Sequence, residues 1–167
     1  MAYRCTQCGK THEEMPQYFM WKKPDCVPGS AHEFIEDSKS LARLGDSRFF
    51  VMCEVEMCVA SDPNRKLGFM CWVEVEISVY ESLLAFRRNE AELPAPTDLI
   101  EGRLANPVPC VAETLGLPVR FAVMKGDPTP YIKWVASGTA LDDLLQTGAS
   151  MEYWHEAAER MGWRADR

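Results

Sequence analysis

Residues 49–59 read FFVMCEVEMCV, and residues 69–79 read FMCWVEVEISV. In both stretches the odd positions are apolar or cysteine, whereas the even positions include glutamates. This alternation with a period of two residues is typical of a β-strand with one buried face. The polar stretch Ser61-Asp62-Pro63-Asn64 breaks the chain, and the connection is short, so the two strands are predicted to form an antiparallel hairpin. We expect its apolar side to face a core and its acidic side to face solvent.

A second hairpin is predicted further along the chain. Residues 117–125 and 131–136 are strand-like, and Gly126-Asp127-Pro128 between them supplies turn residues. Because hairpins followed by helices favour an α+β domain, the predicted fold is α+β. Its antiparallel sheet is built from the two hairpins, with helices packed on one face.

Three helices are predicted from capping signals. Ser78 followed by Glu81 is a capping-box pattern, and so is Thr139 followed by Asp142. A last helix is predicted to start near Ser150, where apolar residues fall on one helical face.

The first 46 residues differ from the rest because their apolar periodicity is poor. They open with Cys5-Thr6-Gln7-Cys8-Gly9. Two thiolates at this spacing can reach one tetrahedral Zn²⁺, and the glycine allows the tight turn of a zinc knuckle. We therefore expect residues 1–46 to form a knuckle and loop segment and residues 47–167 to form the α+β domain, the two making one compact unit.

The knuckle supplies two of the four zinc ligands, Cys5 and Cys8. Cys26 and His32 are the expected remaining ligands of a structural Cys3His site, and His12 is an alternative ligand. Two other interpretations stay open. The cysteines are free thiols, or the motif is a redox CxxC, for which residues 1–4 leave little room for the preceding strand.

A possible interaction surface lies on the acidic side of the first hairpin. It comprises Glu54, Glu56, Glu74 and Glu76, with Trp72 beside them. Such a surface could bind a cation or a basic protein partner.

The alternative is a solvated face on which these carboxylates pair with Arg120 and Lys133 of the second hairpin. Trp72 and Trp134 either mark a binding surface or are covered by a helix. His155 lies among glutamates on the last helix and is expected to be exposed.

Composition restricts the function classes. The net charge is −7, which argues against a nucleic-acid partner. No stretch of about 20 apolar residues occurs, and the N-terminus has no secretory signal pattern, so we expect a cytoplasmic protein with reduced thiols and no membrane partner. The sequence also contains no nucleophile elbow, no HExxH motif and no nucleotide-binding glycine fingerprint.

The order of several short motifs resembles a bacterial family catalogued as domain of unknown function 2199. The motifs are Cys5-x-x-Cys8-Gly9-x-x-His12 with Pro16, Phe49-Phe50-Val51, Trp72-Val73, Leu104-Ala105-Asn106 with Pro109, Thr114-Leu115-Gly116-Leu117, Pro130-Tyr131-Ile132, and Leu141 with Gly148. The resemblance covers most of the chain. It implies a bacterial cytosolic protein and names no reaction.

Three hypotheses follow. The first is a non-enzymatic domain with a structural zinc site that acts through an unknown protein partner. The second is an immunity or antitoxin-like protein whose acidic face covers a basic toxin. The third is an enzyme of unknown class.

Overall fold

The structure is a computed structural model that describes residues 3–4, 11–12, 17–28, 33–92, 98–124 and 127–162. Its strands are β1 (Tyr3–Arg4), β2 (Thr11–His12), β3 (Tyr18–Met20), β4 (Phe34–Ser38), β5 (Leu41–Leu44), β6 (Arg48–Val59), β7 (Asp62–Val75), β8 (Ile100–Leu104), β9 (Pro118–Met124) and β10 (Asp127–Val135). Its helices are α1 (Ile77–Arg87), α2 (Ala140–Thr147) and α3 (Met151–Arg160). The α+β class is therefore confirmed.

The two alternating stretches of the sequence form the long hairpin β6–β7, as predicted. Its antiparallel register joins odd positions to odd positions, such as Val51 to Val73 and Cys53 to Cys71. The second hairpin, β9–β10, also pairs antiparallel, with a bulge on either side of the Tyr131 and Ile132 pairs.

The prediction of an antiparallel sheet built from these two hairpins is wrong. Eight strands form one mixed sheet in the order β3-β7-β8-β9-β10-β6-β5-β4, and β7 also pairs with β6. The strands β6 to β10 therefore close into a five-stranded ring. The pairs β3–β7 and β10–β6 are parallel, because β3 and β10 each join a strand far away in the sequence.

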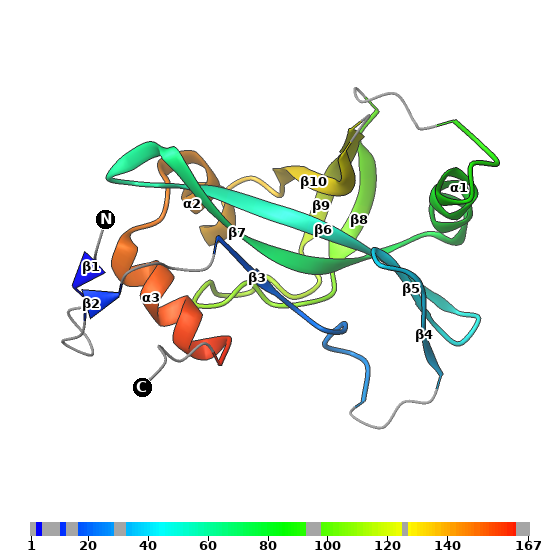
Figure 1. Cartoon of the computed structure of the whole chain (residues 1–167), viewed down its shortest axis with the longest axis horizontal. Helices are drawn as coiled ribbons and strands as arrows, with labels where there is room; N and C mark the ends of the chain where they lie inside the picture. The colour runs from blue at the N-terminus through cyan, green and yellow to red at the C-terminus, as the bar shows by residue number, and fades with distance from the viewer. Residues whose placement is uncertain are drawn as a thin grey trace.

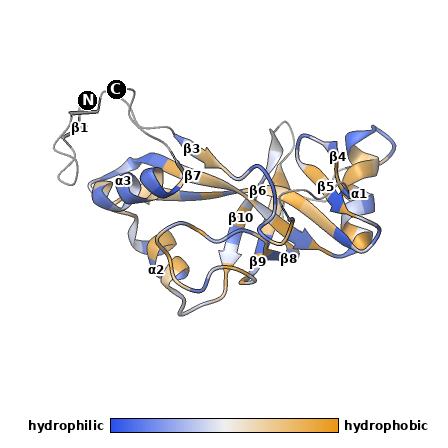
Figure 2. Ribbon diagram, turned by 90° about the horizontal axis from the view of Figure 1, so that it is seen from below, coloured by the Kyte–Doolittle hydropathy of each residue, from blue (hydrophilic) through white to orange (hydrophobic). Residues whose placement is uncertain are grey.

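The core fills the inside of this ring. The odd side chains of β6 and β7 meet Val119, Phe121 and Val123 of β9, and Trp154 of α3 stacks on Phe69 with 5.2 Å between the ring centroids. Helix α1 lies at one end of the sheet and α2 and α3 lie at the other (Figures 1 and 2). The helices thus lie at the two ends of the ring. The prediction that they form a layer over one face of the sheet is wrong.

A second, smaller core lies on the other side of the β6–β7 hairpin, formed by Ala42, Phe50, Met52, Trp72 and Ala105. The loop after β3 is tied down over it. The backbone N–H of Trp72 donates to Oδ1 of Asn106 (2.9 Å), and Nδ2 of Asn106 donates to the carbonyl of Lys23 (2.9 Å). This loop and strands β4 and β5 cover a face that the alternation assigned to solvent.

Sequence position 46 does not divide the sheet, because β5 pairs with β6 along residues 41–44. The knuckle-and-loop segment therefore contributes β3, β4 and β5 to the same sheet as the rest of the chain.

The capping signals gave mixed results. Thr139 accepts a hydrogen bond from the backbone N–H of Asp142, and Ser150 accepts one from Tyr153, so the starts of α2 and α3 are confirmed. The Ser78 capping box is wrong, because α1 already begins at Ile77 and its N-cap Glu76 makes no side-chain cap bond. None of the described helices is long and apolar enough to span a membrane.

Candidate functional site

The predicted zinc ligands lie mostly outside the described residues. Cys5, Cys8 and His32 are not described, and only the backbone of His12 is, as part of β2. Strands β1 and β2 pair antiparallel, with Arg4 opposite Thr11. In the sequence, these two strands are the nearest described residues before Cys5 and after Cys8. Among the described residues, no three histidine, cysteine, aspartate or glutamate side chains are grouped so as to hold a metal ion.

Cys26 is described, and the structure does not bring it close to β1 and β2. Cys26 is exposed in the loop after β3, where the neighbouring Asp25 donates its N–H to the carbonyl of Ala105 (2.8 Å). Arg48 and Glu74 lie near enough for their charges to act on its thiol. Those residues belong to the α1 end of the sheet, whereas β1 and β2 lie beside α3 at the other end (Figure 1).

The predicted interaction surface on the first hairpin needs two corrections. Trp72 is 1% exposed and Glu54 is 5% exposed, so neither can contact a partner on the surface. Trp72 belongs to the second core and packs edge-on against Phe34. The alternation failed here because residues distant in sequence contact both side chains: the second core encloses Trp72, and Tyr18 of β3 hydrogen-bonds Glu54.

Two of the other glutamates are already paired. Glu56 binds Lys66 and accepts a hydrogen bond from the Tyr18 hydroxyl (3.4 Å). Burial, together with Glu54 and Glu56, raises the pKa of the Tyr18 phenol.

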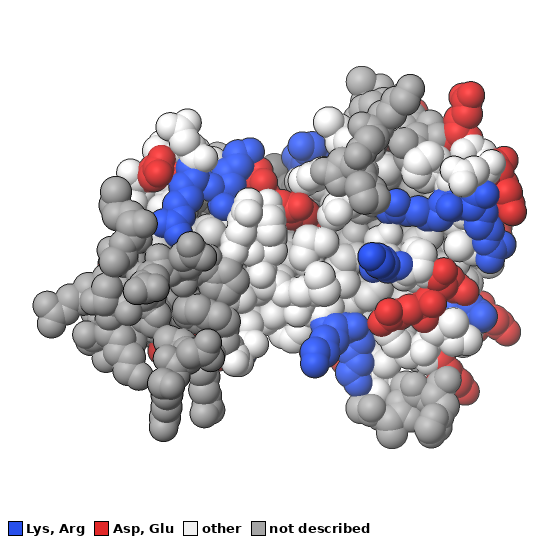
Figure 3. Space-filling view, viewed as in Figure 1, with Lys and Arg blue, Asp and Glu red and all other residues white. Residues whose placement is uncertain are grey.

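Glu74 accepts two hydrogen bonds from Arg48, at 2.7 and 2.6 Å. The cations are therefore Arg48 and Lys66, and not the predicted Arg120 and Lys133. On the side shown in Figure 3, basic and acidic side chains are interspersed around an uncharged centre. Of the four glutamates on which the immunity hypothesis depends, one is therefore buried and two are ion-paired.

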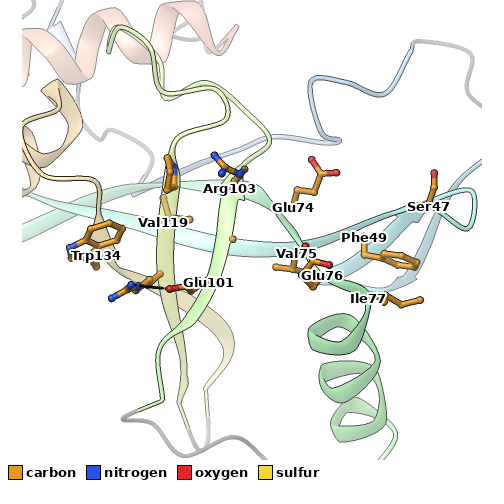
Figure 4. A pocket seen from close by; sticks show the side chains of 13 residues that line it. Ser47, Phe49, Glu74, Val75, Glu76, Ile77, Glu101, Arg103, Val119 and Trp134 are labelled. Carbon is orange, nitrogen blue, oxygen red and sulfur yellow. Dashed lines mark hydrogen bonds and ion pairs between the residues drawn. The ribbon is translucent and has the colours of Figure 1, made fainter.

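A different site lies where β7 turns into α1. There the structure has a pocket of about 660 Å³, which we call the groove. It lies between the outer face of β8–β9–β10 and the β7–α1 junction (Figure 4). Its lining residues are Ser47, Phe49, Glu74, Val75, Glu76, Ile77, Glu101, Gly102, Arg103, Pro118, Val119, Arg120 and Trp134.

One wall of the groove is a row of three side chains from neighbouring strands. Glu101 is opposite Arg120, and Arg120 is opposite Trp134. The Arg120 guanidinium binds the Glu101 carboxylate at 2.9 Å, the contact drawn as a dashed line in Figure 4. The guanidinium carbon also lies 4.9 Å from the centroid of the Trp134 ring. Trp134 stays 37% exposed, which agrees with the binding-surface interpretation of this residue.

The opposite wall is formed by the β7–α1 junction. Ile77 is 48% exposed at the start of α1, and Glu76 precedes it. Gly102 lines the groove between the two walls. A Cβ at this position would lie 2.4 Å from Cγ1 of Val73 and 2.8 Å from the Glu74 carbonyl oxygen. Only glycine lets β8 cross β7 this closely.

The sequence pointed to Trp134, Arg120, Glu74 and Glu76 but not to the groove that they line. Glu101 and Arg103 belong to β8, a five-residue strand that the periodicity did not reveal. His155 was also misplaced, because it is 3% exposed and its Nε2 lies 3.0 Å from Glu159.

Comparison with known proteins gives one match. The family model described as "Uncharacterized protein conserved in bacteria (DUF2199)" matches residues 4–148. No curated protein and no solved structure matches the chain. Because the match covers most of the sequence, the chain belongs to this bacterial DUF2199 family.

Proposed function

We propose that this chain is a non-enzymatic protein-interaction domain of the bacterial cytoplasm, and that it binds its partner in the groove. The observation that carries the proposal is the part-exposed Trp134, held in a concave site by Arg120. Tryptophan and arginine are enriched among the residues that dominate binding energy at protein interfaces. A fixed ring loses little conformational freedom when a partner covers it.

The chemistry of the groove favours binding over catalysis. Its lining residues, all of them described, include no histidine and no cysteine. Two of its three carboxylates, Glu74 and Glu101, are bound to arginines. Groups held in this way position a partner, whereas a general base must be able to take up a proton.

A structural zinc site at Cys5 and Cys8 is the second part of the proposal. The observation that supports it is the antiparallel pairing of β1 and β2, the described strands that flank the motif in the sequence. His12 lies in β2, whereas Cys26 lies near Arg48 and Glu74 at the other end of the sheet. We therefore favour His12 over Cys26 as a ligand. Such a site would stabilise a segment with few apolar residues.

Site-specific photo-crosslinking in cells tests the interaction. A photoreactive amino acid replaces Ile77 in the groove or, as the control, Met20, which is also exposed but lies outside it. We expect a discrete crosslinked protein from position 77 only, and we expect Trp134→Ala to abolish it. The partner, once identified and purified, should bind the wild-type domain directly. Equal crosslinking from both positions, or none from position 77, would refute the proposal.

A further inference from the structure

We infer that the occupant of the groove is an extended protein segment with ordered charges: an apolar side chain for Trp134, an acidic one for Arg103 and a basic one for Glu76. This inference rests on the proposed function and adds the chemistry of the partner. It follows from the shape of the groove and from the charges that its own residues leave unmatched.

The shape favours an extended segment. The lining side chains follow one another from Trp134, past Arg103 and Glu74, to Phe49 and Ser47 (Figure 4). Apolar side chains occur at both ends of this path, with Trp134 at one end and Ile77 and Phe49 at the other. An extended chain can place side chains at these points because every second side chain lies on the same face, at a spacing of about 6.6 Å.

The charges give the segment a direction. Glu101 is neutralised by Arg120, and Glu74 by the bidentate contact with Arg48. Two charges in the groove have no ion-pair partner among the described residues. They are Arg103, which donates only to the Gly116 carbonyl (3.3 Å), and Glu76 at the N-cap of α1.

Arg103 and Glu76 have opposite sign, so the groove is dipolar and not acidic or basic as a whole. Arg103 of β8 lies opposite Glu74 of β7, and Glu76 follows Glu74 by two residues, just after the end of β7. A uniformly basic segment would meet Arg103, and a uniformly acidic one would meet Glu76. Like charges placed together at an interface suppress binding, and opposite charges fix the register of the partner.

A peptide-display selection on the purified full-length protein tests this inference. We expect wild-type protein to enrich peptides in which an apolar residue, an acidic residue and a basic residue recur in one order. The variants Arg103→Glu and Glu76→Lys should each weaken a selected peptide about tenfold. The double variant should instead select peptides with the two charges exchanged.

The control pair is Glu36→Lys with Lys39→Glu, two exposed residues outside the groove. It should leave selection and affinity unchanged, and thermal melting of every variant confirms that it is folded. Peptides without a charge order, or the same peptides from the double variant and the wild type, would overturn the inference. If no peptide is selected although position 77 crosslinks a protein, the partner is a folded surface; the inference then fails while the proposed function stands.

Discussion

The guanidinium of Arg120 covers the ring of Trp134, with 4.9 Å between its central carbon and the ring centroid, while Glu101 holds the same guanidinium at 2.9 Å. Each contact alone is modest at an exposed site. Together they fix an aromatic side chain that remains accessible, which is how a binding hot spot is organised before the partner arrives.

Replacing Trp134 should therefore weaken binding far more than folding. We expect Trp134→Ala to lower the affinity for the partner by about 30-fold or more, because hot-spot truncations cost about 2 kcal/mol or more. Its free energy of unfolding should change by less than about 1 kcal/mol, since the ring is part-exposed. Titration calorimetry with the purified partner and urea unfolding measure the two effects. A loss confined to stability would contradict the role of this residue.

Trp72 provides the matched buried tryptophan, and it should behave in the opposite way. Its ring is 1% exposed in the second core, so Trp72→Ala should reduce the free energy of unfolding by about 3–5 kcal/mol. Urea unfolding followed by circular dichroism measures this directly. A reduction in the free energy of unfolding as small as that of Trp134→Ala would mean that the loop after β3 does not cover this core in solution.

The thiol of Cys71 should make stability depend on alkaline pH. Burial raises its pKa from the ordinary 9.0 to about 12. The folded state then holds the proton more tightly than the unfolded state, so the stabilisation is complete below pH 9 and is lost as the pH rises towards 12.

The slope from this one thiol reaches at most about 1.4 kcal/mol per pH unit. Comparing Cys71→Ala with wild type between pH 8 and 10.5 separates the contribution of this thiol from that of the tyrosines, because both proteins contain the same tyrosines. If the free energies of unfolding of wild type and Cys71→Ala change in parallel with pH, the Cys71 thiol is not buried from solvent, and the prediction fails.

Metal content tests the knuckle. We expect about one zinc per chain in untagged wild-type protein, loss of that zinc in Cys5→Ser and in His12→Ala, and retention in Cys26→Ser. Mass spectrometry of protein purified without chelator gives the count, and thermal melting shows whether zinc stabilises the chain. Loss of zinc in Cys26→Ser would restore the Cys26–His32 ligand set. Metal-free wild-type protein would remove the site altogether.

Local patterns predicted the local structure well. The period-two alternation of residues 49–59 and 69–79 gave the β6–β7 hairpin with the correct face inward, and Thr139 gave the start of α2. Both depend on residues that are close in sequence, and such interactions can be recognised without knowing the rest of the fold.

What failed depends on distant segments. Glu54 and Trp72 have the spacing of solvent-facing residues, but Tyr18 of β3 hydrogen-bonds Glu54 and the loop after β3 lies over the core that contains Trp72. The groove joins Ile77, Glu101 and Trp134 from three separate elements, and only the strand order brings them together.

The odd number of strands in the ring has a consequence for how the chain is made. An antiparallel meander of five strands must bring its first and last members together in the same direction, as Glu54 of β6 and Tyr131 of β10 show. During synthesis the β6–β7 hairpin emerges from the ribosome early. The edge of β6 that pairs with β10 stays unpaired until residues 127–135 have been made. Loop closure over such a separation is slow. Until β10 arrives, the nascent chain exposes an apolar strand edge of the kind that chaperones protect.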